Sequence, residues 1–308
     1  MGKRWPLCPI PFFGRGHFRP VHIAFLVLLL PAAGTGRGEE ARRRVARARQ
    51  GPALQRNIAP SRCVAQASLP ASSKPTAPLG PANLPPSPSH PAGDPNKGEM
   101  GLGAVPGRQP AFRKGLAMAV QYAKAVDCPR IHLMAGRVPV GADRAAVAGE
   151  METTFIENLR YAADVLAQED MIGLIEPINS RITDPRYFLN TPHQAAAILE
   201  KVGRPNLKLQ LDIFHCQIMD GNLSRNLETY FPLIGHIQIA QVPGRNEPDS
   251  PGEVNFPYLF QLLESLGYTG YVGCEYAPKG DTVEGLGWLR SYWESRGLQH
   301  GETGKATE

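Results

Sequence analysis

The stretch "LKLQLDIFHCQIMDG", residues 207–221, is a short apolar run that leads into an acid, Asp212, and then a histidine, His215. A run of this length is typical of a strand that is buried in a parallel sheet. A buried strand does not need a carboxylate at its end, so the pair belongs either to a solvated loop or to a functional site.

The same pattern of a helix followed by a buried strand continues on both sides of this stretch. Apolar residues at helical spacing precede each apolar run, and Thr191, Pro192 and Gly203 are typical bounds of one such helix. This alternation predicts βαβ units and a parallel sheet. The predicted strands are 130–135, 171–176, 207–212, 235–240 and 271–276, and the predicted helices are 112–126, 157–170, 191–203, 223–231, 256–267 and about 283–295.

The last four predicted strands each end in or near a polar residue that a hydrophobic core would not favour. In a closed parallel barrel the C-terminal ends of the strands converge on one mouth, where catalytic groups lie. Three carboxylates at one mouth would repel, and a hard divalent cation such as Mg²⁺ or Mn²⁺ would remove that conflict. One such residue alone is most simply a helix cap or a loop charge. The predicted metal ligands are Glu176, Asp212, Gln238 and Glu275.

Four segments carry a resemblance to the hydroxypyruvate isomerase family, within the group of xylose-isomerase-like TIM barrels. They are "IEPIN", "LDIFHCQIMDGNL", "GHIQIAQVPGRNEPDSPGEVNFPYLF" and "GYVGCEYAPKGDTVEGLGWL", and the resemblance covers about residues 93–297. It implies an isomerase that interconverts hydroxypyruvate and 2-hydroxy-3-oxopropanoate (tartronate semialdehyde) through an enediolate. The group also contains ketose 3-epimerases, which would use the same two glutamates on a longer sugar, so an epimerase is the enzymatic alternative. These epimerases have a histidine where this chain has Gln238, which is a weaker metal ligand.

The resemblance also implies roles for individual residues. Glu176 and Glu275 would remove and return carbon-bound protons, Asp212 would be a metal ligand, and His215 would face the oxygens of the substrate. Arg245, in "PGRNEP", is a candidate to hold the substrate carboxylate through two hydrogen bonds.

Residues 1–92 depart from the family pattern. They carry thirteen Lys and Arg but only two Glu, and the stretch 60–95 is rich in proline, so we expect this segment to be disordered. A TIM barrel has eight strands and five are predicted here. The expected fold is therefore an incomplete TIM (β/α) barrel over 93–297, with a short tail at 298–308. Its open sheet would expose two edges and apolar inward-facing residues, which leaves open whether the chain is an active isomerase or an inactive binding variant.

The remaining composition bears on location and partners. The five cysteines are odd in number and widely spaced, which argues against a disulfide framework or zinc site and favours a reducing cytoplasm; they are Cys8, Cys63, Cys128, Cys216 and Cys274. The apolar run 23–30 is too short to span a bilayer, although its setting also suits a secretory signal. The arginine run at 41–50 is expected to be solvated, with a small molecule rather than a specific nucleic acid as the partner. A non-catalytic protein that binds through this basic tail is the remaining alternative.

Overall fold

The structure is a computed structural model that describes residues 27–29, 64–66, 98–125 and 127–296. The predicted tail at 298–308 and the arginine run at 41–50 lie outside the described residues. The same holds for the predicted disorder and the predicted secretory signal of residues 1–92, apart from two short strands.

Five parallel strands form the centre of the sheet and confirm the predicted incomplete TIM barrel. Neighbouring strands in the chain are neighbours in the sheet, and every pair among the five is parallel. Together with the two short strands the order is β1-β7-β6-β5-β4-β3-β2, so the sheet of the described strands is open. The five strands are β3 (Arg130–His132), β4 (Ile172–Ile175), β5 (Leu207–Asp212), β6 (Ile234–Ile239) and β7 (Tyr271–Cys274).

The two edges of the sheet carry strands that the sequence did not predict. Strand β1 (Val27–Leu29) pairs with β7 in antiparallel direction, and β2 (Val64–Gln66) pairs with β3 in parallel direction. The expectation that residues 1–92 contain no strand is therefore wrong for these six residues. An edge strand presents unpaired N–H and C=O groups, which a three-residue extended segment can pair with whatever its sequence pattern.

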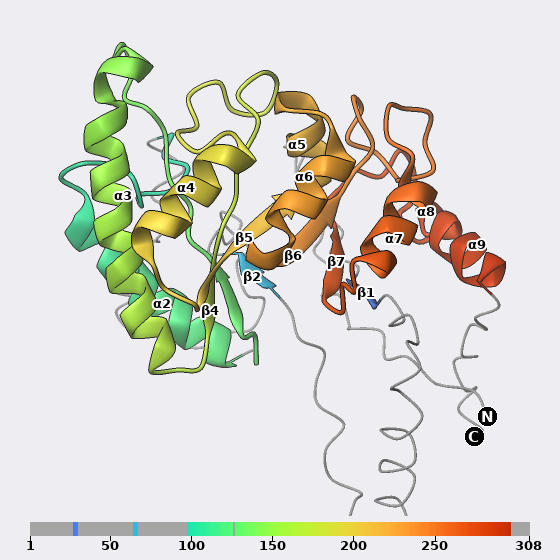
Figure 1. Cartoon of the computed structure of the whole chain (residues 1–308), viewed down its shortest axis with the longest axis horizontal. Helices are drawn as coiled ribbons and strands as arrows, with labels where there is room; N and C mark the ends of the chain where they lie inside the picture. The colour runs from blue at the N-terminus through green and yellow to red at the C-terminus, as the bar shows by residue number, and fades with distance from the viewer. Residues whose placement is uncertain (1–26, 30–63, 67–97, 126, 297–308) are drawn as a thin grey trace, which may run out of the picture.

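The predicted helices are present in the predicted order, and the sequence did not predict the short helix α5 (Ile213–Met219), which follows β5 directly (Figure 1). Helix α4 begins after Thr191, whose hydroxyl accepts a hydrogen bond from the Gln194 amide, and ends at Gly203 in the left-handed conformation, as predicted. None of the helices in the described part of the chain is long and apolar enough to cross a membrane. The helices are α2 (Gln109–Ala125), α3 (Arg144–Ala167), α4 (Pro192–Val202), α5 (Ile213–Met219), α6 (Leu223–Tyr230), α7 (Phe256–Ser265), α8 (Thr282–Gly285) and α9 (Gly287–Ser295), with a 3₁₀ turn at Phe231–Leu233.

Helix α3 begins well before its predicted start at residue 157. Asp143 caps it by accepting a hydrogen bond from the Ala146 amide, and the additional turns bury Met151 and Phe155. The prediction was too short because "RAAVAGEMET" has few large apolar residues, whereas a good cap and alanine-rich turns are enough to continue a helix.

The two faces of the sheet differ in chemistry. On the helix side, Gly173 lies against the side chains of Leu133, Leu166 and Leu207. On the other face, Gly273 lies against His236 and Gln238. Because side chains alternate along a strand, the polar residues Gln210 and Asp212 share a face of β5. The expected apolar inner face is therefore wrong: it is mainly polar, with Leu174 an apolar member, and its polar side chains include Arg130, His132, Glu176, Gln210, Asp212, His236, Gln238 and Glu275.

Candidate active site

The four predicted strand-end residues lie on the same face of the sheet. Asp212 is the last residue of β5 and is paired in register with Gln238 on β6. Glu176 directly follows β4 and Glu275 directly follows β7. All four are between 1% and 6% exposed, so their polar atoms must find partners within the protein or in a bound ligand.

A chain of side-chain amides joins the two glutamates. The Nε2 of Gln210 donates to Glu176 Oε2 at 2.8 Å and also to Oε1 of Gln238. The Nε2 of Gln238 in turn donates to Glu275 Oε2. Sequence analysis missed Gln210, although its place two residues before Asp212 puts it on the same face of the strand.

The two carboxylate oxygens of Asp212 have different surroundings. Its Oδ1 accepts hydrogen bonds from the backbone amides of Phe214, at 2.7 Å, and His215, at 3.4 Å, and so caps α5. Its Oδ2 is buried and has no hydrogen-bond partner among the described residues. The carboxylate is therefore a helix cap that also presents one free oxygen to the mouth.

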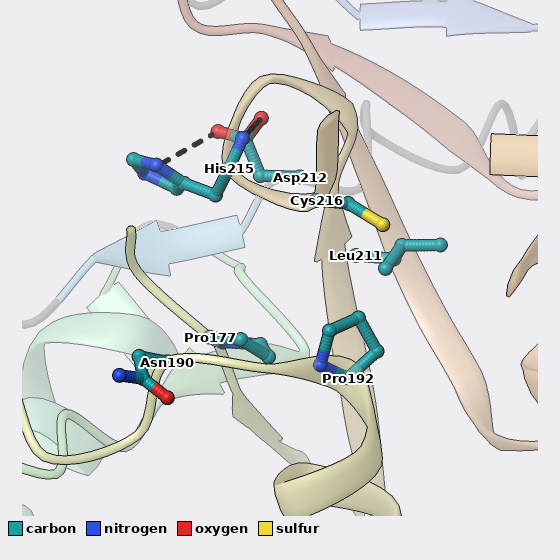
Figure 2. A pocket seen from close by; sticks show the side chains of 7 residues that line it. All are labelled: Pro177, Asn190, Pro192, Leu211, Asp212, His215 and Cys216. Carbon is teal, nitrogen blue, oxygen red and sulfur yellow. Dashed lines mark hydrogen bonds and ion pairs between the residues drawn. The ribbon is translucent and has the colours of Figure 1, made fainter. Parts of the chain in front are cut away.

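His215 is held in the first turn of α5, with its ring facing the carboxylates. Its Nε2 lies 3.8 Å from Glu176 Oε1 and 3.8 Å from Asp212 Oδ2, and Figure 2 shows the second of these contacts. Its Nδ1 lies 2.7 Å from Nδ2 of Asn179. Burial lowers the pKa of His215 to about 4, with Arg245 acting in the same direction against Asp212, so the ring is neutral near pH 7.

The small pocket beside His215 lies between the ends of β4 and β5 and the start of α4. Figure 2 shows the side chains of Asp212 and His215 turned toward one another, with Pro177, Asn190 and Pro192 on the opposite side of the view. The residues that line it are Pro177, Asn190, Pro192, Leu211, Asp212, His215 and Cys216.

Arg245 reaches the site from the loop after β6. Its backbone has φ of +55°, a left-handed conformation that costs free energy in a non-glycine residue and is typical of functional sites. The guanidinium Nη2 lies 3.1 Å from Glu275 Oε1 and 3.9 Å from Asp212 Oδ2, and the group stacks over Phe214 at 5.0 Å. Arg245 is thus a partly buried cation beside two acids, and not a loop charge in solvent.

Both glutamates hold their protons more tightly than ordinary carboxyl groups. Burial raises the pKa of Glu176 well above its usual value, and the Glu275 and Asp212 carboxylates raise it further. Burial also raises the pKa of Glu275 to about 7, although Arg245 opposes this. Two neighbouring carboxyls with raised pKa values favour a state with one protonated and one ionised, as acid–base chemistry near neutral pH requires.

Three side chains of the site come together closely enough to bind a cation. Within the described residues, ligand atoms of Glu176, Asp212 and His215 lie within 4.8 Å of one another. Two of the three belong to the predicted ligand set, whereas Glu275 is not in this group and the Gln238 oxygen accepts a hydrogen bond from Gln210. The Oδ2 of Asp212, which accepts no hydrogen bond among the described residues and lies near a second carboxylate, fits a hard divalent cation.

A parallel β/α sheet with acids and a histidine at its C-terminal strand ends has the features of a TIM-barrel active site. The family model described as "Xylose isomerase-like TIM barrel" matches residues 81–292, and the chain belongs to that family.

Individual relatives agree with this assignment. A Homo sapiens protein named "Putative hydroxypyruvate isomerase" is 73% identical over 215 residues, which are 70% of this chain and 77% of that protein. A "2-oxo-tetronate isomerase" of Cupriavidus necator is 48% identical over 65% of this chain and 75% of its own length. The crystal structure of an "AP endonuclease, family 2" from Brucella melitensis superimposes with a TM-score of 0.61 at 47% identity, covering 66% of this chain and 76% of that one.

Proposed function

We propose that this chain is an isomerase that interconverts hydroxypyruvate and 2-hydroxy-3-oxopropanoate. The observation that carries the proposal is the pair of buried glutamates, Glu176 and Glu275, which face one mouth with raised pKa values. The name of the human relative supports the choice of substrate.

The reaction moves one proton between adjacent carbons without a change in overall oxidation state. The ionised glutamate removes a proton from carbon 3 of hydroxypyruvate, and the electron pair of that C–H bond forms an enediolate with carbon 2. The protonated glutamate then gives its proton to carbon 2. A proton also passes from the oxygen on carbon 3 to the oxygen on carbon 2, so that carbon 3 becomes the aldehyde and the atoms balance.

The other residues of the site bind the substrate and stabilise charge. Arg245 holds the substrate carboxylate. When the substrate binds, its carboxylate replaces Glu275, which lies 3.1 Å from the guanidinium, as the partner of Arg245. His215 faces the oxygens on which negative charge develops. Glu176 and Asp212 would hold a divalent cation. Gln238 and Glu275 are the other two ligands that the sequence predicts. When bound, such an ion polarises the substrate oxygens.

A thermal melt tests the proposed metal site directly. Millimolar Mn²⁺ is expected to raise Tm, because an ion that binds only the folded state stabilises it by mass action. Asp212→Asn retains an oxygen for the helix cap but removes the charge, so it is expected to abolish the rise. An unchanged Tm of the unsubstituted chain would show that the carboxylates form a metal-free site.

Product analysis tests the proposed substrate. The purified chain is incubated with hydroxypyruvate, a 2-oxo-tetronate or a ketohexose, and we expect conversion of the first to exceed the others at least about tenfold in kcat/KM. The second substrate is included because of the Cupriavidus relative, and the third tests the epimerase alternative. If the chain converts either competitor faster than hydroxypyruvate, that competitor is the substrate and the proposal is wrong.

We further propose a reducing, cytoplasmic location and no specific nucleic-acid partner. In the part of the chain that the structure describes, Cys216 and Cys274 are buried free thiols, which supports such a compartment. The alternative of a non-catalytic protein that binds through its basic tail predicts a salt-dependent gel shift that is lost when residues 1–92 are removed.

A further inference from the structure

We propose that Asn179 fixes the tautomer of His215, so that the ring presents an N–H group, and not a lone pair, to the mouth of the barrel. This inference rests on the proposed function for its catalytic meaning, because it assigns a role to a residue of the same site. Asn179 follows β4 at the end of "IEPIN", is fully buried, and makes direct contact with His215.

The side-chain amide of Asn179 can take only one orientation. Its Oδ1 accepts hydrogen bonds from the backbone amides of Ile182 and Thr183, both at 3.0 Å. Its Nδ2 lies 2.8 Å from the Thr183 hydroxyl and 2.7 Å from Nδ1 of His215. A rotation of the amide by half a turn would bring its NH₂ group against the two backbone N–H donors of Ile182 and Thr183, and both would lose this acceptor. The backbone therefore determines that Nδ2 faces the histidine.

An amide NH₂ group is only a donor, so the Nδ1 atom that it faces must be an acceptor. A neutral imidazole with its lone pair on Nδ1 carries its hydrogen on Nε2. That Nε2 atom faces Glu176 Oε1 and Asp212 Oδ2, each at 3.8 Å. His215 consequently points an N–H donor into the space between the two carboxylates.

The position of His215 alone would allow it to be either a metal ligand or a hydrogen-bond donor to the substrate, and the orientation of Asn179 decides between these two roles. A metal ligand must offer a lone pair, which Nε2 of this tautomer lacks. A donor at the same place stabilises an oxygen that becomes negative in the enediolate. Asn179 is thus a positioning residue that makes His215 a partner of the substrate, and the cation is left to the carboxylates.

The variant Asn179→Asp reverses the arrangement with little change in shape. One carboxylate oxygen still accepts from Ile182 and Thr183, whereas the other now faces Nδ1 and requires a proton there. The lone pair of His215 then moves to Nε2, between Glu176 and Asp212. We expect a drop in kcat of at least about tenfold with KM within about threefold, and a gain in Mn²⁺ affinity of at least about tenfold.

The direct measurement is the tautomer itself, by two-bond ¹H–¹⁵N NMR of the full chain at about pH 7.5 without substrate. The His215 signals are identified by their loss in His215→Gln. We expect Nε2 protonated in the unsubstituted chain and Nδ1 protonated in Asn179→Asp. The control is Asn190→Asp, which adds a charge to the same pocket without contacting Nδ1, and its His215 tautomer is expected to stay as in the unsubstituted chain.

A His215 protonated on Nδ1 in the unsubstituted chain would overturn the inference, even if Asn179→Asp did not fold. An Asn179→Asp chain that folds and keeps its proton on Nε2 would overturn it as well. The tautomer is read without turnover, so a chain with the expected tautomer but no activity on hydroxypyruvate would contradict the proposed function alone.

Discussion

Glu176→Gln and Glu275→Gln are each expected to lower kcat for hydroxypyruvate by at least about a hundredfold, because an amide cannot take up or release the proton. Both positions prefer an uncharged group, since burial raises the pKa of each carboxyl. The substitutions should therefore leave Tm unchanged or raise it. Steady-state kinetics and a thermal melt on the same preparations measure the two effects.

Glu247→Gln is the matched control for these variants. Glu247 is also buried, at 5% exposed, but its carboxylate accepts hydrogen bonds from the Lys279 amide in a loop outside the mouth. Its replacement is expected to keep kcat within about threefold. Near-normal turnover in either site variant would remove that glutamate from the proton-transfer pair.

The second large effect concerns the incomplete barrel. We expect the isolated chain to be prone to aggregation and to have less than about one hundredth of the kcat/KM of the human relative. Three-residue strands protect the two edges of the sheet only weakly against pairing with another chain. Buried polar atoms on the inner face also lack hydrogen-bond partners among the described residues, which lowers the stability of the fold. These atoms are Nε and Nη1 of Arg130, both ring nitrogens of His132, and Oε1 of Gln210.

Gel filtration, circular dichroism with heating, and a coupled assay for the semialdehyde make this comparison. The human relative serves as the reference under the same conditions. A monomeric chain with a cooperative melt and activity close to that of the reference would show that residues 1–92 complete the barrel.

The sequence predicted the five strands because their patterns are local. The same holds for helix α4, since Thr191 and Gly203 mark its ends by capping rules that involve only nearby residues. The inner face was misjudged because Gln210 and His236 were read as members of apolar runs, whereas their alternation with Leu209 and Ile237 places them on the opposite face.

The site was predicted in its acids but not in the residues that orient them. Strand-end carboxylates can be recognised one strand at a time. The roles of Gln210 and Asn179 depend on contacts with side chains 34 and 36 positions away in the chain, respectively, which only the folded sheet brings together. Short edge strands such as β1 were missed for a similar reason, because pairing with β7 and not local pattern produces them.

The two oxygens of Asp212 have a consequence for how sequences of this family are read across species. Oδ1 caps α5 whether or not any chemistry takes place, so selection for a folded protein alone would retain the aspartate in a relative that has lost its activity. The buried glutamates bring no such benefit, since their carboxyl groups are costly to ionise where they lie. In a lineage that drifts towards a non-enzymatic role, Glu176 and Glu275 should therefore be replaced before Asp212, and their presence is the better indicator of a working enzyme.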